Sequence, residues 1–195
     1  NGTNLPLDVE RGIRASIAAQ MFALALPGCT YIYQGEELGL PEALEIPEDA
    51  IQDPQYLQNN KIDKGRDGCR VPLPWKSSGP SFGFGEAGAH LPQPPHFAKY
   101  SVEAESADEN SPLAIFRAAL ALRKNLVAPE TMEWIETGNT ETLHFARPNG
   151  WHCLTNFGHT PVAIPEGFEI LHASGPLEGT SLPGATTVWL RSIHA

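Results

Sequence analysis

The stretch "LPGCTYIYQGEELGLPE", from Leu26 to Glu42, decides how the whole chain is interpreted. Its middle part, Cys29 to Gly35, is a short run of β-branched and aromatic residues that a glycine stops. A continuous apolar strand directly after a helix is typical of a buried parallel sheet. We therefore predict a strand at Thr30–Gln34, as one element of such a sheet.

Residues 8–26, just before this run, have the pattern of an amphipathic helix. Asp8 is a suitable N-cap, and Pro27-Gly28 is a suitable end signal. Apolar residues recur at helical spacing; they are Ile13, Ile17, Met21 and Leu24.

A very long irregular stretch follows, over residues 36–110, and it holds half of the prolines. "PEDAIQDPQYLQ" predicts a helical turn or two, whereas "SSGPSFGFGEAGAHLPQPPHF" predicts no regular structure. A loop of this length is usually functional or disordered. Its aromatic residues, among them Trp75, Phe84 and Phe97, favour an ordered and functional loop.

The rest of the chain changes from helix to strand. Residues 111–127 predict a helix that Ser111 caps, with an apolar stripe of Leu113, Phe116, Leu120 and Leu126. Six short β-rich segments then alternate with turn residues, which is typical of a small antiparallel β domain. The segments are "MEWIE", "TLHFAR", "WHCLTNF", "TPVAI", "FEILHA" and "TTVWLR".

Composition and charge exclude several kinds of partner. The chain has 195 residues and a formal net charge of -10, which argues against binding to nucleic acid or to an anionic membrane. Three distant cysteines without a CxxC motif favour a reducing, cytoplasmic compartment. The seven histidines lack zinc-ligand spacing, and no nucleotide-binding glycine pattern occurs, so we expect neither a metal nor a cofactor.

Three segments, in this order, carry a resemblance to a known family: "LPGCTYIYQGEELGLPE", "PEDAIQDP" and "RDGCRVPLPW". They resemble segments of the α-glucosidases of glycoside hydrolase family 13, in particular the oligo-1,6-glucosidase branch. The helix with "FRAALALRK" and the closing β domain are also similar to the end of that family's chain.

The resemblance implies an α/β plus all-β fold. Residues 1–128 would be the last part of a (β/α)8 barrel, with the long loop after its eighth strand, and residues 129–195 a C-terminal β-sandwich. Loops at the C-terminal ends of barrel strands build the active site, which explains the long loop. The first residues, which include no methionine, suggest a piece of a longer polypeptide, whose remaining barrel would be this chain's partner.

The family's chemistry is retaining glycoside hydrolysis by two carboxyl groups. In the family, these groups and a third, stabilising aspartate follow strands four, five and seven, the last within an Asn-His-Asp motif. No Asn-His-Asp occurs in this sequence. We therefore expect no catalytic residue in this chain, an inactive chain on its own, and an active parent enzyme that takes α-glucosidic oligosaccharides such as maltose, isomaltose or sucrose.

In "GRDGCRVPLPW", from Gly65 to Trp75, the resemblance implies two substrate-binding residues. Arg66 matches a family arginine that contributes to the pocket for the terminal glucose, and a guanidinium suits vicinal hydroxyls. Asp67 is expected to accept hydroxyl protons near the leaving sugar. Arg70 is expected to be structural, and core packing is favoured over sugar stacking for Trp75.

Two adjacent carboxylates, Glu36 and Glu37, are expected to support neighbouring loops, because side chains next to each other in sequence rarely flank one bond. Other functions stay open at this stage. One is a non-catalytic module that binds a sugar or a partner. Another is a sister activity of the same family, namely trehalose synthase, sucrose isomerase or glucosyl transferase.

Overall fold

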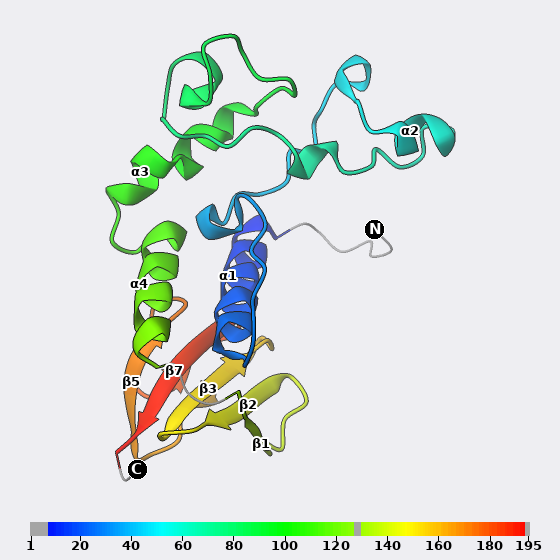
Figure 1. The fold of residues 1–195 in the computed structure, drawn as a ribbon. Coiled ribbons are helices and arrows are strands. Elements are labelled where there is room, and N and C mark those ends of the chain that lie inside the picture. The colour runs from blue at the N-terminus through cyan, green and yellow to red at the C-terminus, as the bar shows by residue number, and fades with distance from the viewer. Residues whose placement is uncertain (1–7, 127–129, 194–195) are drawn as a thin grey trace. The chain divides into compact units, whose positions relative to one another are not determined.

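The computed structural model describes residues 8–126 and 130–193, and the chain divides into two compact units. The first, the helix–sheet unit, comprises residues 1–37 and 114–195; the second, the loop unit, comprises residues 38–113. Figure 1 labels helices α1 to α4 and strands β1, β2, β3, β5 and β7.

Helix α1, Val9–Ala25, opens the helix–sheet unit as predicted. The Asp8 side chain caps it by accepting a hydrogen bond from the Arg11 backbone N–H at 2.9 Å. Its buried face includes Ile17, Met21 and Leu24, three members of the predicted stripe. One turn of 3₁₀ helix, η1, Glu36–Leu38, ends the segment that follows it.

Helix α4, Pro112–Asn125, confirms the second predicted helix. Its stripe differs at one position, because Leu120 is exposed and Ala119 is fully buried in its place. Ala119 packs in the same core as Phe116 and the sheet, where a small side chain permits close approach.

The sheet of this unit is antiparallel and five-stranded, in the order β1-β2-β3-β7-β5, as predicted for a β domain. Five of the six predicted β-rich segments contribute one strand each to it, and the sixth, "TPVAI", forms β4. A two-stranded ribbon of β4 and β6 accompanies the sheet, and the prediction lacked β6. The strands are β1 Glu133–Ile135, β2 Thr142–Arg147, β3 Trp151–Asn156, β4 Val162–Ala163, β5 Phe168–Ala173, β6 Ser181–Leu182 and β7 Thr186–Ser192.

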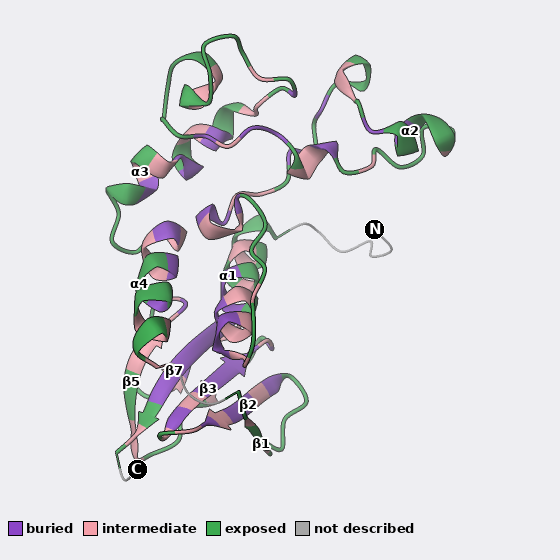
Figure 2. Cartoon of the chain, in the orientation of Figure 1, coloured by how far each residue is buried: buried purple, intermediate pink, exposed green. Residues whose placement is uncertain are grey.

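Helices α1 and α4 share one hydrophobic core with the sheet. Met21, Phe116 and Trp189 meet there, and Figure 2 shows that the central strands β3 and β7 are largely buried. Two side chains of β7 also donate hydrogen bonds to carbonyls inside α1: Thr187 Oγ1 to Ala18 at 2.7 Å, and Trp189 Nε1 to Met21 at 3.2 Å. These bonds fix the position of α1 along the strand.

A second hydrophobic cluster joins β3, β7 and the β4–β6 ribbon through Leu154, Leu182 and Leu190. A pair of histidines lies on strands β2 and β3: His144 Nε2 lies 3.1 Å from His152 Nδ1, and the His152 ring contacts Phe168. Burial, and then the neighbouring His152, lower the pKa of His144 to about 4. The spacing of histidines along the sequence did not predict this pair, because cross-strand pairing creates it.

No strand forms at Thr30–Gln34, contrary to the prediction. All strand pairings of the described residues are antiparallel and lie between Glu133 and Ser192. A parallel strand needs a neighbour for its backbone groups, and the described part of the chain supplies none. Tyr31 accordingly has 96% of its surface exposed.

The loop unit has short helical turns and a core of its own. The turns are η2 Glu48–Ala50, α2 Pro54–Gln58, η3 Asp67–Cys69, η4 Pro80–Gly83, η5 Pro95–Tyr100 and α3 Val102–Ser106. Helix α2 confirms the helical turns expected in "PEDAIQDPQYLQ", whereas α3, η4 and η5 were not predicted. Ile46, Val71, Leu91 and Phe97 form the core, so this stretch is ordered, as its aromatic residues indicated.

Two further observations concern the chain as a whole. Within residues 8–126 and 130–193, no helix has both the length and the apolar character needed to cross a bilayer. Cys29, Cys69 and Cys153 are all free thiols.

Candidate functional site

The Asp53 carboxylate joins two motifs of the loop unit. Its Oδ2 accepts the Arg66 backbone N–H at 2.8 Å and the Arg70 Nη1–H at 2.9 Å, while its Oδ1 caps α2 through the Gln55 N–H at 3.0 Å. The amide of Arg66, then that of Gln55, lowers the pKa of Asp53, and nearby Arg70 acts in the same direction. This buried anion therefore anchors the backbone at Arg66.

Asp67 makes the reciprocal connection. Its Oδ2 accepts the backbone N–H groups of Gln52 and Asp53, the latter at 2.9 Å. The residue is buried, with an exposed fraction of 4%. Two carboxylates thus bind each other's loops through backbone amides, and only Asp67 Oδ1, at 3.8 Å from Arg70 Nη1, is without a backbone partner here.

Two glycines make this close approach of the two motifs possible. Gly65 has a φ of +72°, and a Cβ added there would lie 2.5 Å from Asp53 Cγ. A Cβ on Gly68 would lie 2.8 Å from the Ala43 carbonyl oxygen. Only glycine is compatible with these distances, so "GRDG" is held to its partner segment by shape as well as by charge.

The two arginines of the motif have different surroundings. Arg70 pairs with Asp53 and lies near Asp67, in agreement with the structural role predicted for it. Arg66 is exposed, and its guanidinium forms no hydrogen bond or ion pair with residues 8–126 or 130–193. The network therefore fixes the Arg66 backbone and leaves its donors available.

The prediction of core packing for Trp75 is wrong, because 51% of its surface is exposed. Its backbone is nevertheless well held: its N–H donates to the Phe82 carbonyl at 2.8 Å, and its carbonyl accepts from Glu103 at 3.1 Å. Pro72 and Pro74, which both precede Trp75, restrict φ in this part of the backbone.

The carboxylates of Glu36 and Glu37 bind backbone amides of their own loop. Glu36 Oε2 accepts the Tyr33 N–H at 3.0 Å, and Glu37 Oε2 accepts the Gly35 N–H at 2.9 Å. They therefore support their own loop, whereas the prediction was support of neighbouring loops.

Sequence reasoning missed Asp53 as a member of this site. The motif "QDP" contains a signal for it, since Asp before Pro is a usual helix N-cap. The signal predicts the bond to Gln55 only, because the bonds to Arg66 and Arg70 depend on how two distant segments meet.

A family model described as "Alpha amylase, catalytic domain" matches residues 3–130. A probable alpha-glucosidase of Rhizobium meliloti is 39% identical over 129 residues, which are 65% of this chain and 23% of that protein. The oligo-1,6-glucosidase of Parageobacillus thermoglucosidasius is 28% identical over 164 residues, which are 72% of this chain and 29% of that protein.

Solved structures show the same relationship. An alpha-glucosyl transfer enzyme is 30% identical, with a TM-score of 0.76 over 92% of this chain and 36% of its own chain. A trehalulose synthase, 20% identical, shares the fold with a TM-score of 0.73.

The chain spans about a quarter of the length of the two curated relatives above. It matches the alpha-amylase model over its helix, long loop and second helix, and its solved relatives carry the corresponding part of a (β/α)8 barrel followed by a β domain. The chain belongs to the alpha-amylase family, glycoside hydrolase family 13.

Proposed function

We propose that this chain is the C-terminal part of a retaining α-glucosidase that hydrolyses terminal α-glucosidic bonds of short oligosaccharides. The family membership and the names of the curated relatives support the reaction class. The main support for a substrate-binding role of this loop is the exposed guanidinium of Arg66, whose backbone Asp53 anchors.

Arg66 binds hydroxyl groups of the terminal glucose in this proposal. A guanidinium offers several N–H donors in a fixed geometry that matches vicinal hydroxyls. The group also remains positively charged at every relevant pH. Asp67 contributes in two ways: its Oδ2 holds the Gln52–Asp53 backbone, and its Oδ1 is the atom that would accept a sugar hydroxyl.

The domain boundary belongs to the same proposal. Residues 1–128 form the end of the catalytic barrel and residues 129–195 the C-terminal β-sandwich, and the catalytic carboxylates come from the rest of the polypeptide. The free thiols of all three cysteines are compatible with a cytoplasmic enzyme.

A second candidate is transfer of the glucosyl group rather than hydrolysis. It is favoured by the solved alpha-glucosyl transfer enzyme, at 30% identity over 92% of this chain. Both reactions pass through the same kind of glycosyl-enzyme intermediate and differ in whether water or a sugar accepts the glucosyl group.

Product analysis of the whole protein separates the two candidates. The protein is incubated with maltose, isomaltose and sucrose, and the products are resolved by chromatography. Release of free glucose in proportion to substrate consumed supports hydrolysis, whereas new oligosaccharides or sucrose isomers support transfer. Absence of any reaction on all three sugars would contradict the proposed reaction class.

A further inference from the structure

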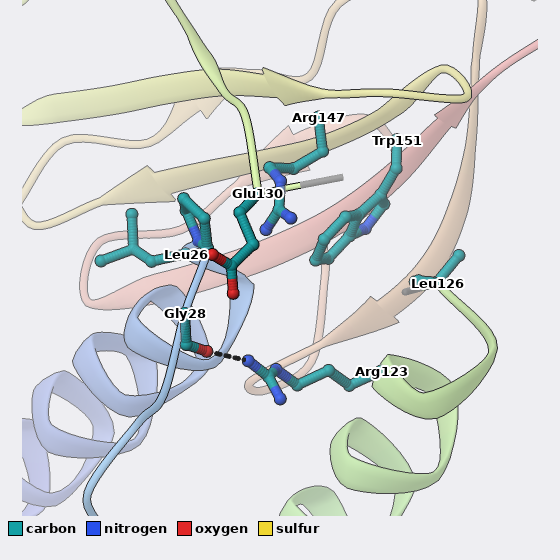
Figure 3. Close-up of a pocket in the computed structure, with 8 residues that line it drawn as sticks. Leu26, Gly28, Arg123, Leu126, Glu130, Arg147 and Trp151 are labelled. Atoms are coloured by element: carbon teal, nitrogen blue, oxygen red, sulfur yellow. Dashed lines mark hydrogen bonds between the residues drawn. The ribbon is translucent and has the colours of Figure 1, made fainter. Parts of the chain in front are cut away.

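A pocket of about 180 Å³ lies in the helix–sheet unit, where the C-terminal ends of α1 and α4 meet β2 and β3. Figure 3 shows Arg147 and Trp151 on one side of it, Arg123 on the other, and the Glu130 side chain between them. All of these residues belong to one compact unit, and none belongs to the loop unit that carries Arg66.

Arg123 has N–H donors in this pocket that form no hydrogen bond with the described residues. Its Nε–H donates to the Leu24 carbonyl at 2.7 Å and its Nη2 to the Gly28 carbonyl at 2.8 Å, at the end of α1. A guanidinium has five N–H groups. Two are used, and the remaining three have no partner among the described residues.

The indole of Trp151 adds a buried donor without a partner. Only 3% of the residue's surface is exposed, and its Nε1–H finds no acceptor within residues 8–126 and 130–193. A buried polar group left unpaired costs free energy. An oxygen atom in the pocket would remove that cost.

Glu130 supplies acceptors to the same space. Its carboxylate forms no hydrogen bond or ion pair with the described residues. The pocket therefore combines unused donors on Arg123 and Trp151 with unused acceptors on Glu130, a combination that suits hydroxyl groups, which donate and accept at once.

The charge of the pocket selects a neutral ligand. Arg123, Arg147 and Glu130 together carry one net positive charge. The C-termini of α1 and α4 oppose it, each acting as roughly half a negative charge. The balance is close to zero, which favours neither a free anion nor a cation.

The volume selects a small ligand. At about 30 Å³ per water molecule, 180 Å³ holds roughly six waters. Sites for drug-sized ligands begin near ~300 Å³. One sugar ring, partly outside the pocket, is about the largest molecule that fits.

We propose that this pocket binds a single sugar unit through its vicinal hydroxyls, at a site separate from the Arg66 loop. In this arrangement Arg123 donates to two neighbouring hydroxyl oxygens, Glu130 accepts from one of them, and the Trp151 indole N–H donates to a further oxygen. The site binds sugar without performing chemistry on it.

The test uses ¹⁹F NMR of the whole protein labelled with 5-fluorotryptophan. The Trp151 resonance is assigned as the one missing in Trp151→Phe, and D-glucose is titrated into the unsubstituted protein. We expect this resonance to move and to saturate in the millimolar range. The Glu130→Ala variant, which breaks no hydrogen bond among the described residues, should weaken binding about tenfold or more.

Arg123→Lys should weaken it similarly, because one ammonium does not reproduce the planar fork. This variant also loses the bonds to α1, so its melting temperature is measured beside it. Lys124→Ala, which changes an exposed cation one residue away, serves as the control and should leave the response of the Trp151 resonance to glucose unchanged.

Three results would overturn the proposal. One is a Trp151 resonance that does not respond to glucose. Another is an equal response to acetate at the same ionic strength or to 1-propanol, which would indicate an anion site or an apolar site. The last is a Glu130→Ala variant that binds glucose as tightly as the unsubstituted protein.

Discussion

Gly65 directly precedes Arg66, whose backbone amide donates to Asp53. Its φ is +72°, and the Asp53 side chain leaves no room for a Cβ. Gly65→Ala places a Cβ 2.5 Å from Asp53 Cγ, so the carboxylate must leave the Arg66 amide. We expect a loss of stability greater than the ~1–2 kcal/mol of left-handed strain alone, and a lower kcat/KM in the whole protein. Urea denaturation and steady-state kinetics measure both.

Gly79 offers a matched control within the same unit. Its φ is +88°, and a Cβ there meets nothing within 4 Å. The ψ of Gly79 is -179°, a conformation that is nearly restricted to glycine, so Gly79→Ala should cost only the backbone strain, about 1–3 kcal/mol, and leave kcat/KM unchanged. Equal effects of the two substitutions would show that the contact with Asp53 is unimportant.

Residue types, read together with the family resemblance, predicted part of this site. The resemblance to a known family, added to them, distinguished Arg70, which pairs with Asp53, from Arg66, which is exposed. They did not predict that the Asp67 carboxylate binds the Gln52 and Asp53 amides, because that geometry arises only when two segments separated by 14 residues meet. Local sequence carries charge and turn preference, but not the partner of a buried carboxylate.

At the scale of elements, the His144–His152 pair makes the sheet sensitive to acid. The unfolded chain binds a proton at His144 near pH 6.5, whereas in the folded protein burial lowers this pKa to about 4. The stabilising contribution is therefore complete above pH 6.5 and is lost as pH falls towards 4. A shift of this size is worth at most about 3 kcal/mol, and solvent screening reduces it to roughly 1–2 kcal/mol.

We predict that the melting temperature of the sheet, followed by tryptophan fluorescence, falls by several degrees between pH 6.5 and pH 4. Burial lowers the pKa of His152 as well, so the double variant His144→Phe/His152→Phe should remove most of this slope. His159→Ala, at an exposed position, should keep it. A double variant with an unchanged slope would assign the acid sensitivity to other groups.

Elements with a strong periodic pattern were predictable, and elements that depend on distant partners were not. Both long helices and the six β-rich segments follow from spacing and turn residues. The segment Thr30–Gln34 has the residues of a strand but no neighbour to pair with among the described residues. The short strand β6, Ser181–Leu182, shows the converse, since it exists only because it pairs with β4.

At the scale of the whole molecule, we predict that the 195-residue chain by itself does not hydrolyse α-glucosides. The family's reaction needs two carboxyl groups and a third, stabilising one, and the Asn-His-Asp motif that carries one of them does not occur here. A sensitive assay with p-nitrophenyl α-glucoside, on the chain and on the whole protein side by side, measures this. Turnover by the chain that disappears when one of its own carboxylates is replaced would contradict the assignment.

The sequence predicted the order of the structural elements, but not the details of the reaction. The order of helix, long loop, helix and β domain agrees with the family match, because each element has its own local signal. Which α-glucosidic bond is cleaved, and whether water or a sugar accepts the glucosyl group, depends on residues that meet in three dimensions. Arg66 is one such residue, and the described chain leaves its side chain without a partner.

The most direct test of the account is to compare Arg66→Ala, Arg66→Lys and Arg70→Ala in the whole protein, measuring kcat/KM and melting temperature for each. A lost hydrogen bond to a charged group costs about 1.5–3 kcal/mol. Arg66→Ala should therefore lower kcat/KM about ten- to a hundredfold with little change in melting temperature, and lysine should not restore it. Arg70→Ala should mainly lower the melting temperature, because it removes the charged partner of buried Asp53. Near-normal kinetics in Arg66→Ala, with lost activity in a fully folded Arg70→Ala, would contradict the account.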